Sequence, residues 1–351
     1  MFPAYPIYMN ILTLPTIEEL HKQLQVPLVN TGRQQFFFSG IVSDDLERLH
    51  ALTDANGKVR FMSGTEFSFA VYRGQTEQYP ACVPPLARIE SFPSQLLELC
   101  RSIAFEDAVD TLPIVQVSRD IQFLGQPLHI DTEGLAQHYG MCTNLLDCTS
   151  NFDVASFFAT CQFNKHNRQY EPVSFCEKPG IIYQLLPFLL TEETSSGFEI
   201  IGWQPLPRPE EQRSFAIRLK HGQKLQDLPT VQSFPFRHKS RISRRIYDAF
   251  EQGRSLFPTE PVAEMSILAE KLYQFTRSQV DRAWNRLISW REAPGETAIS
   301  TQSEQDAGIE LVEIPILSWA GMDIEKDDEL LRSKLQDVCN RVRYRRACYA
   351  T

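Results

Sequence analysis

The sequence predicts an α+β protein in which a mixed or antiparallel β core is flanked by helices. The first observation is a set of short apolar or alternating segments, which are typical of strands. They are FSFAVYRG at 67–74, TNLLD at 143–147, GIIYQLLPF at 180–188, EIIGW at 199–203 and RSFAIRL at 213–219. The second observation is that segments with helical periodicity lie between and after these strands, rather than alternating regularly with them. Together they predict the α+β class. The absence of a GxGxxG loop removes the usual support for a Rossmann fold.

The helical segments have recognisable start and stop signals. Thr16 can cap a helix in TIEELHKQLQ, and the ILTL that precedes it at 11–14 is typical of a strand. Further helices are expected at 92–105, 131–140, from a cap at Ser150 or Asn151 through the apolar face that follows, and at 243–253. Pro261 begins the longest helical pattern, which runs to about Trp290.

The chain divides into a main domain over 1–275 and a helical C-terminal extension over 276–351. Residues 28–64 form an irregular or hairpin-containing insertion. Residues 291–308 are polar and predict a linker. Beyond it, Leu331 and Leu335 share one face of a predicted helix, and we expect this tail to dock on the main domain or bind a protein partner.

Composition restricts the classes of function. Of 351 residues, 42% are hydrophobic, which predicts a folded chain, and no apolar run is long enough to span a bilayer. A net charge of −9 argues against nucleic-acid or membrane binding. None of the eight cysteines forms a CxxC pair and no His lies at a zinc-ligand spacing from two of them, so we expect reduced thiols and no metal site. The first residues, MFPAYPIYMNILTLP, lack the basic region and the cleavage site of a signal peptide, so we expect a cytoplasmic location.

Arg73 and Gly74 end the first predicted strand of the core. A guanidinium at a strand end can grip a diphosphate through two hydrogen bonds, and glycine lets a ligand or another backbone approach closely. The alternative for Arg73 is a buried ion pair with Asp147.

The segment from His138 to Ser150 carries the second group of candidates. His138 and Tyr139 lie at a predicted helix end and can orient a nicotinamide or another base by stacking and hydrogen bonding. Asp147, Thr149 and Ser150 follow a short strand and open a helix, whose free N–H groups can hold an anion or ribose hydroxyls. The alternatives are a dipole partner for His138 and helix capping for Thr149 or Ser150.

Separated strings of the sequence resemble the FRG-domain family in their order. They are YRGQ (72–75), YPACVPPLAR (79–88), QHYGMCTNLLDCTSNFDVASFFA (137–159), the Arg208, Gln212 and Phe215 positions of LPRPEEQRSF, and GRSLFP (253–258). The resemblance covers about residues 10–275. Arg213-Ser214 departs from the family pattern, in which a glycine usually precedes the aromatic residue.

The motif order of this family is similar to that of ADP-ribosyltransferases, which implies an ADP-ribosyltransferase-like fold and NAD as substrate. In that scheme Arg73, Gly74, Tyr139, Asp147, Thr149 and Ser150 bind the nucleotide, and His138, Glu211 and Gln212 surround the reacting bond. The scheme needs a carboxylate near an oxocarbenium-like sugar, which Glu211 can supply and Gln212 cannot.

We therefore expect a nucleotide-using effector that cleaves NAD or transfers ADP-ribose to a target, as a toxin or in defence against phage. One alternative is a non-catalytic module that senses a nucleotide or peptide. The other is a nuclease that uses Asp147 and Glu residues with Mg²⁺.

Overall fold

The computed structural model describes residues 11–24, 49–53, 58–63, 70–123, 125–174, 177–186, 197–292, 299 and 301–344. Its centre is a six-stranded sheet in which every neighbouring pair of strands is antiparallel. The strand order is β10 (Phe198–Ile200), β11 (Ser214–Arg218), β6 (Leu145–Thr149), β3 (Val71–Gln75), β9 (Gly180–Leu185) and β12 (Val231–Phe236). The predicted α+β class with an antiparallel core is confirmed, and each of the five apolar or alternating segments between residues 67 and 219 contributes a strand to this sheet. Only β12 was not predicted.

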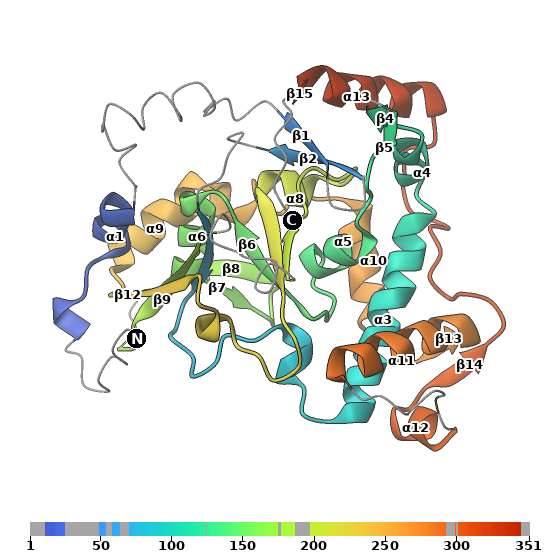
Figure 1. The fold of residues 1–351 in the computed structure, drawn as a ribbon, viewed down its shortest axis with the longest axis horizontal. Coiled ribbons are helices and arrows are strands. Elements are labelled where there is room, and N and C mark those ends of the chain that lie inside the picture. The colour runs from blue at the N-terminus through green and yellow to red at the C-terminus, as the bar shows by residue number, and fades with distance from the viewer. Residues whose placement is uncertain are drawn as a thin grey trace.

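Helices cover the sheet on the face that Tyr72, Gly74 and Ile182 share. They include α1 (Ile17–Leu24), α5 (Thr132–His138), α6 (Phe152–Thr160) and α9 (Ser240–Ala249). Figure 1 shows α1, α6 and α9 gathered at one end of the sheet and α5 at the other. The opposite face carries Leu146, Cys148 and Tyr183, and irregular segments that include Cys82 and Leu225 cover it.

The prediction of one helix from Pro261 to Trp290 is wrong, because this segment forms two helices. They are α10 (Pro261–Ala269) and α11 (Arg277–Arg291). Between them β13 (Gln274–Thr276) pairs in parallel with β14 (Glu310–Val312). Thr276 then caps α11 through a reciprocal capping box with Gln279. The second helix therefore has a start signal of its own. Helix α11 packs against the longest helix, α3 (Phe92–Asp110).

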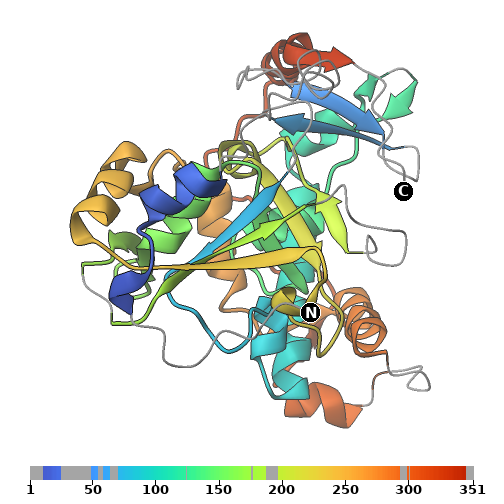
Figure 2. The ribbon, with the colours of Figure 1, turned by 60° about the vertical axis from the view of Figure 1, so that its left-hand side comes forward.

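A second, smaller sheet joins segments from opposite ends of the chain. Strand β1 (Leu49–Thr53) pairs with β2 (Val59–Ser63) on one side and in parallel with β15 (Val342–Tyr344) on the other. Helix α13 (Asp328–Arg341) lies beside this sheet and buries Leu331 and Leu335 against the same cluster as Phe61. Figure 2 shows these elements together, apart from the large sheet. Most of the predicted insertion at 28–64 lies outside the described residues.

The remaining elements are short connections. They are α4 (Pro113–Arg119), α8 (Pro207–Glu211), α12 (Thr301–Asp306), β4 (Gln122–Phe123), β5 (Gln126–Pro127), β7 (Cys161–Asn164), β8 (Gln169–Pro172), and the 3₁₀ helices η1 (Ile11–Thr13), η2 (Pro85–Arg88), η4 (Leu225–Asp227) and η5 (Glu251–Gly253). The strand predicted at 11–14 is wrong. Its residues form η1, because the amide of Leu14 turns back to the carbonyl of Ile11. Thr16 does cap the following helix, as predicted, by accepting from the amide of Glu19.

Candidate functional site

Asp147 lies in the middle of β6, not after its end as the sequence predicted, because β6 extends to Thr149. Its neighbours Leu146 and Cys148 point to the opposite face of the sheet and are buried there. The side chain of Asp147 lies on the face covered by α5 and keeps 37% of its surface exposed. A partly open carboxylate therefore stands near the centre of the sheet.

Helix α5 brings an amide and an imidazole to this carboxylate. Gln137 donates from Nε2 to Oδ2 of Asp147 over 3.2 Å, and its own Oε1 accepts from the hydroxyl of Thr143. His138 follows as the last residue of α5, with only 2% of its side chain exposed. The sequence did not single out Gln137, although it stands in the string that carried the resemblance.

Gln212 determines which nitrogen of His138 carries the proton. Its Nε2 donates to the carbonyl of Leu256 over 3.0 Å, so Oε1 must be the atom that faces Nδ1 of His138 at 3.1 Å. An acceptor at that position requires Nδ1 to donate. Nε2 of a neutral His138 therefore has a free lone pair.

Two buried acceptors consequently face each other. Nε2 of His138 lies 3.9 Å from Oδ1 of Asp147, and neither atom has a hydrogen-bond partner among the described residues. In the neutral form of His138 the two atoms cannot satisfy each other, because both need donors, whereas a protonated His138 forms an ion pair with Asp147 at this distance. The pair suits a ligand that offers two adjacent donors, such as a vicinal diol or a carboxamide.

Arg73 reaches the backbone of β6 from the opposite face of the sheet, the face on which its partner in β9, Tyr183, packs with Cys148. It donates from Nη1 to the backbone carbonyl of Asp147 over 2.6 Å, and its Nε is buried without a partner among the described residues. It forms no ion pair with a carboxylate there, so the ion pair with Asp147 that the sequence left open is replaced by a bond to the backbone. The register of β3 against β6 records a single pair, Tyr72 with Thr149. Arg73 lies beyond it, where its guanidinium bridges the two strands.

Gly74 permits a close approach, but the approaching group is a helix. A Cβ added at Gly74 would lie 2.8 Å from the backbone nitrogen and 2.9 Å from the Cβ of Ala159, and closer still to the carbonyl oxygen of Ala155. Both residues belong to α6. The glycine therefore allows α6 to pack directly on β3.

Tyr139 is enclosed rather than facing a ligand. Its ring is 2% exposed and lies beneath the guanidinium of Arg208, 4.2 Å from the ring centre. Its hydroxyl donates to Glu260, which also pairs with Arg208 at 3.5 Å. Burial, followed by the charge of Glu260, raises the pKa of Tyr139, so its phenol stays protonated. These three residues form a buried wall behind His138, whose carbonyl accepts from Arg208.

Thr149 and Ser150 form hydrogen bonds mainly with backbone groups. The hydroxyl of Thr149 accepts from the amide of Asn151, and the amide of Ser150 donates to the carbonyl of Arg213. Asn151 is the cap of α6, accepting from the amides of Asp153 and Val154. Of the two caps that the sequence left open, Asn151 is therefore the one used.

Glu211 and Gln212 point in different directions from the end of α8. Gln212 is buried against His138, whereas Glu211 is exposed. The nearest charges acting on Glu211 are Glu210, Arg213 and Arg341, and burial followed by Glu210 raises its pKa. The structure brings together the side chains of His138, Asp147 and Gln212, with Arg73 on the backbone of Asp147, and it leaves Glu211 outside this group.

Other reactive groups are less well placed. Burial raises the pKa of the Cys148 thiol to about 12, as it does for Cys142, which disfavours a thiolate nucleophile at either position. Within the described ranges, no group of three or more His, Cys, Asp or Glu side chains is arranged to hold a metal ion. No helix of the described residues is both long and apolar enough to cross a bilayer.

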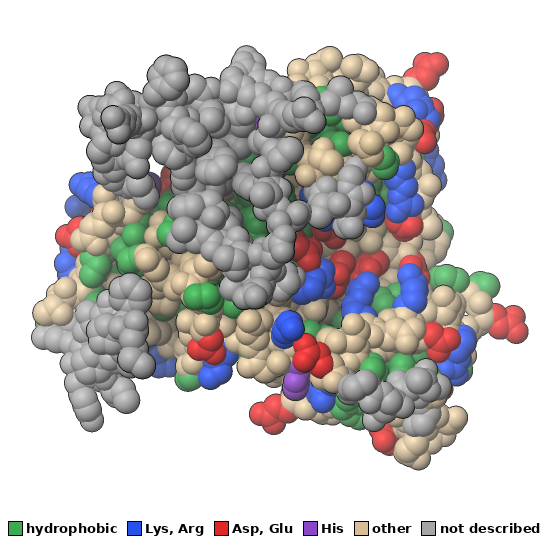
Figure 3. All heavy atoms as spheres, in the orientation of Figure 1, with side chains coloured by type: hydrophobic (Ala, Val, Ile, Leu, Met, Phe, Trp, Pro, Cys, Tyr) green, Lys and Arg blue, Asp and Glu red, His purple; other side chains and the backbone are tan. Residues whose placement is uncertain are grey.

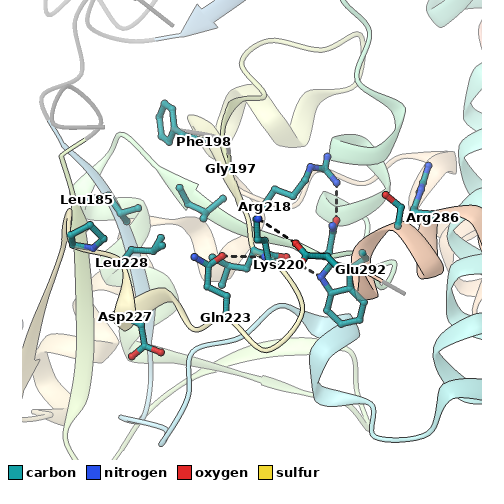
Figure 4. A pocket seen from close by; sticks show the side chains of 16 residues that line it. Leu185, Gly197, Phe198, Arg218, Lys220, Gln223, Asp227, Leu228, Arg286 and Glu292 are labelled. Carbon is teal, nitrogen blue, oxygen red and sulfur yellow. Dashed lines mark hydrogen bonds and ion pairs between the residues drawn. The ribbon is translucent and has the colours of Figure 1, made fainter. Parts of the chain in front are cut away.

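A cavity of about 630 Å³ lies elsewhere, between β9, the segment after β11, and α11. Figure 4 shows Leu185 and Leu228 at one end and Arg218 and Arg286 at the other. The arginines are already paired, Arg218 with Glu133 at 2.8 Å and Arg286 with Glu106 at 2.6 Å. None of the residues predicted from the sequence lines this cavity. Figure 3 shows that basic and acidic side chains are likewise intermixed on the described part of one face of the molecule.

These features define a class of protein: an α+β domain whose antiparallel sheet carries a carboxylate and an arginine on two central strands, with a histidine from the end of α5 facing the carboxylate. Residues 68–168 match the family model of the FRG domain, so this chain contains an FRG domain. The match includes Arg73, His138 and Asp147 but ends before α8 and Gln212, and it is narrower than the predicted 10–275. No curated protein and no solved structure matches the chain.

Proposed function

We propose that this chain binds a nucleotide at His138, Asp147 and Arg73 and cleaves NAD between nicotinamide and ribose. The observation that carries the proposal is the facing pair of buried atoms, Nε2 of His138 and Oδ1 of Asp147, together with the guanidinium of Arg73 on the backbone carbonyl of the same aspartate. The 2′ and 3′ hydroxyls of a ribose are adjacent donors that can satisfy both acceptors. The phosphate attached to a nucleotide ribose suits Arg73.

Asp147 takes the part that the sequence assigned to Glu211. When nicotinamide leaves with the bonding electron pair, positive charge develops on the ribose, and a carboxylate held beside the sugar stabilises it. Water then adds to the anomeric carbon and releases a proton to solvent, giving ADP-ribose. A hydroxyl or amine of a protein target in place of water would make the reaction an ADP-ribose transfer.

The antiparallel sheet and the FRG match are compatible with an ADP-ribosyltransferase-like fold, which is part of the same proposal. A role as a toxin or in phage defence, and a protein target, stay predictions.

The test is to incubate the purified chain with NAD and measure released nicotinamide by chromatography. Asp147→Asn preserves the shape of the side chain but removes its charge, so we expect a loss of turnover of about 100-fold or more. Glu211→Gln changes an exposed carboxylate outside the group and serves as the control, with turnover within about twofold of the unmodified chain. Full activity of Asp147→Asn together with loss in Glu211→Gln would return the carboxylate role to Glu211.

A second candidate is nucleotide binding without turnover. It is favoured by the inward position of the neutral Gln212 and the outward position of Glu211. Calorimetric binding of NAD by the unmodified chain, with no nicotinamide released over hours, would support the binding module over the enzyme.

A further inference from the structure

The small parallel sheet of β13 and β14 has a free edge that continues into an extended segment. Strand β14 pairs with β13 and with no other strand of the described residues. The chain that follows it, residues 313–317, forms no hydrogen bond with another described residue. Figure 1 shows β14 at the border of the molecule, from where the chain runs along the outside towards α13. We call residues 310–317 the β14 edge segment.

The pairing with β13 determines which backbone groups of β14 face the free edge. The amide of Glu310 donates to the carbonyl of Tyr273 over 2.8 Å, so the N–H and C=O of Glu310 point towards β13. These groups alternate between the two sides of a strand, and those of Leu311 therefore point away from β13. An added strand can form hydrogen bonds with them.

Large apolar side chains are exposed along the β14 edge segment. Leu311 is 46% exposed, Ile314 73% and Ile316 45%. Single exposed apolar residues are normal on a folded protein, whereas several that are close together are typical of interaction surfaces.

The β14 edge segment is anchored on both sides. Ile309, just before it, is buried in the cluster formed by α3 and α11, and Leu317 packs against the same cluster. Trp319, just after it, is buried and donates from Nε1 to the carbonyl of Ala108 over 2.8 Å. A segment that is already extended and held in place loses little conformational entropy when a second strand pairs with it.

The charge of this region determines which kind of partner fits. Residues 301–325 include acidic side chains but no lysine, arginine or histidine. Glu310 and Glu313 are both exposed, and neither forms an ion pair with a described residue. Arg101 of α3, which lies over the tyrosine ring next to β13, is already paired with Glu98. Two copies of the segment would bring like charges together, whereas a basic strand would place opposite charges side by side.

We propose that the β14 edge segment binds an extended segment of a partner protein in which lysine or arginine alternates with apolar residues. The partner segment adds to the free edge of β14 as a third strand. Hydrogen bonds to the backbone of Leu311 and contacts with Ile314 provide affinity, and Glu310 and Glu313 select a basic partner. The proposal is independent of the proposed function, since none of these residues belongs to the group around Asp147.

Fluorescence anisotropy of a labelled synthetic peptide of alternating lysine and valine, titrated with the full chain, tests this surface. A lysine–serine peptide of the same length and charge is the control for apolar contacts, and a glutamate–valine peptide is the control for charge. We expect the lysine–valine peptide to bind at least about 10-fold more tightly than either control. Equal binding of the lysine–serine peptide, or no binding of the lysine–valine peptide, overturns the proposal.

Substitutions locate the binding surface. Ile314→Ser and Glu313→Lys each change one exposed side chain of the β14 edge segment and should each weaken binding of the lysine–valine peptide about 10-fold or more. Leu330→Ser and Asp337→Lys make comparable changes at exposed positions of α13 and should have no effect. Circular dichroism checks that each variant is folded. An equal loss in Asp337→Lys would mean that overall charge attracts the peptide, and it would reject this segment as the site.

Hydrogen exchange followed by NMR tests the addition of a strand. Saturation with the lysine–valine peptide should slow exchange of the Leu311 amide at least about 10-fold, because this amide gains a hydrogen-bond partner. Unchanged exchange at Leu311 in the saturated complex contradicts strand addition. A dimer of the chain alone that dissociates in Ile314→Ser would show that a second copy occupies the edge, which overturns the choice of partner.

Discussion

Gly74 is the residue at which the large sheet and α6 come closest. Because the atoms that a new Cβ would meet belong largely to the backbone of α6, they cannot move aside as a flexible side chain would. We expect Gly74→Ala to lower the free energy of unfolding by at least about 1–3 kcal/mol, measured by urea denaturation. Gly222→Ala is a useful comparison: an added Cβ meets nothing there, so only its left-handed backbone is tested. A fully stable Gly74→Ala variant would contradict the direct packing of α6 on β3.

Arg213 shows strain at the level of a single residue. Its φ of 49° lies in the left-handed region, which costs a non-glycine residue about 1–2 kcal/mol. We expect Arg213→Gly to raise the free energy of unfolding by up to about 1 kcal/mol, while Arg213→Ala, which keeps the strain, should not. A destabilised Arg213→Gly would mean that the charge interactions of Arg213 with Glu210 and Glu211 outweigh the strain.

At the scale of elements, α13 is the clearest case of a helix held by one face. Leu335 is 4% exposed and packs with the β1 and β2 cluster, whereas Leu330 on the same helix is 44% exposed. Leu335→Ala should therefore cost about 2–5 kcal/mol in thermal or urea unfolding. Leu330→Ala makes the same chemical change and should stay within about 0.5 kcal/mol. Equal effects of the two substitutions would show that α13 is not docked through this face.

Element prediction from the sequence worked where the local signal was strong. The five core strands, the helix from Thr16 and the apolar face of α13 follow from periodicity and capping residues. The division of 261–290 did not, because Gln274 to Thr276 become a strand only through β14, some 35 residues further along. Strand β12 was not predicted for a related reason. Its strand conformation depends on pairing with β9, which no local sequence pattern indicates.

At the scale of the whole molecule, the FRG match and the folding unit do not coincide. Of the six strands of the large sheet, residues 68–168 contain only β3 and β6, whose register records one residue pair. The strands that pair with them more extensively, β9 and β11, lie beyond residue 168. We expect a fragment of residues 68–168 to be unfolded by circular dichroism and NMR, because an isolated sheet of two poorly paired strands cannot bury its faces.

A longer fragment, residues 11–292, contains every strand of the large sheet as well as α11, and should fold. A cooperative unfolding transition in the 68–168 fragment would contradict this argument and make the matched region an independent domain.

The sequence by itself determined the α+β class, five of the six strands of the large sheet and a short set of candidate residues, because hydrophobic periodicity and capping are local properties. The tertiary structure alone decided which candidates meet. Arg73 and His138 are 65 positions apart, and only the pairing of β6 with its neighbours and the packing of α5 bring them to the same residue, Asp147. It also decided that Gln212 rather than Glu211 faces His138, since two adjacent residues at a helix end point to different sides, and no local pattern specifies which side is buried.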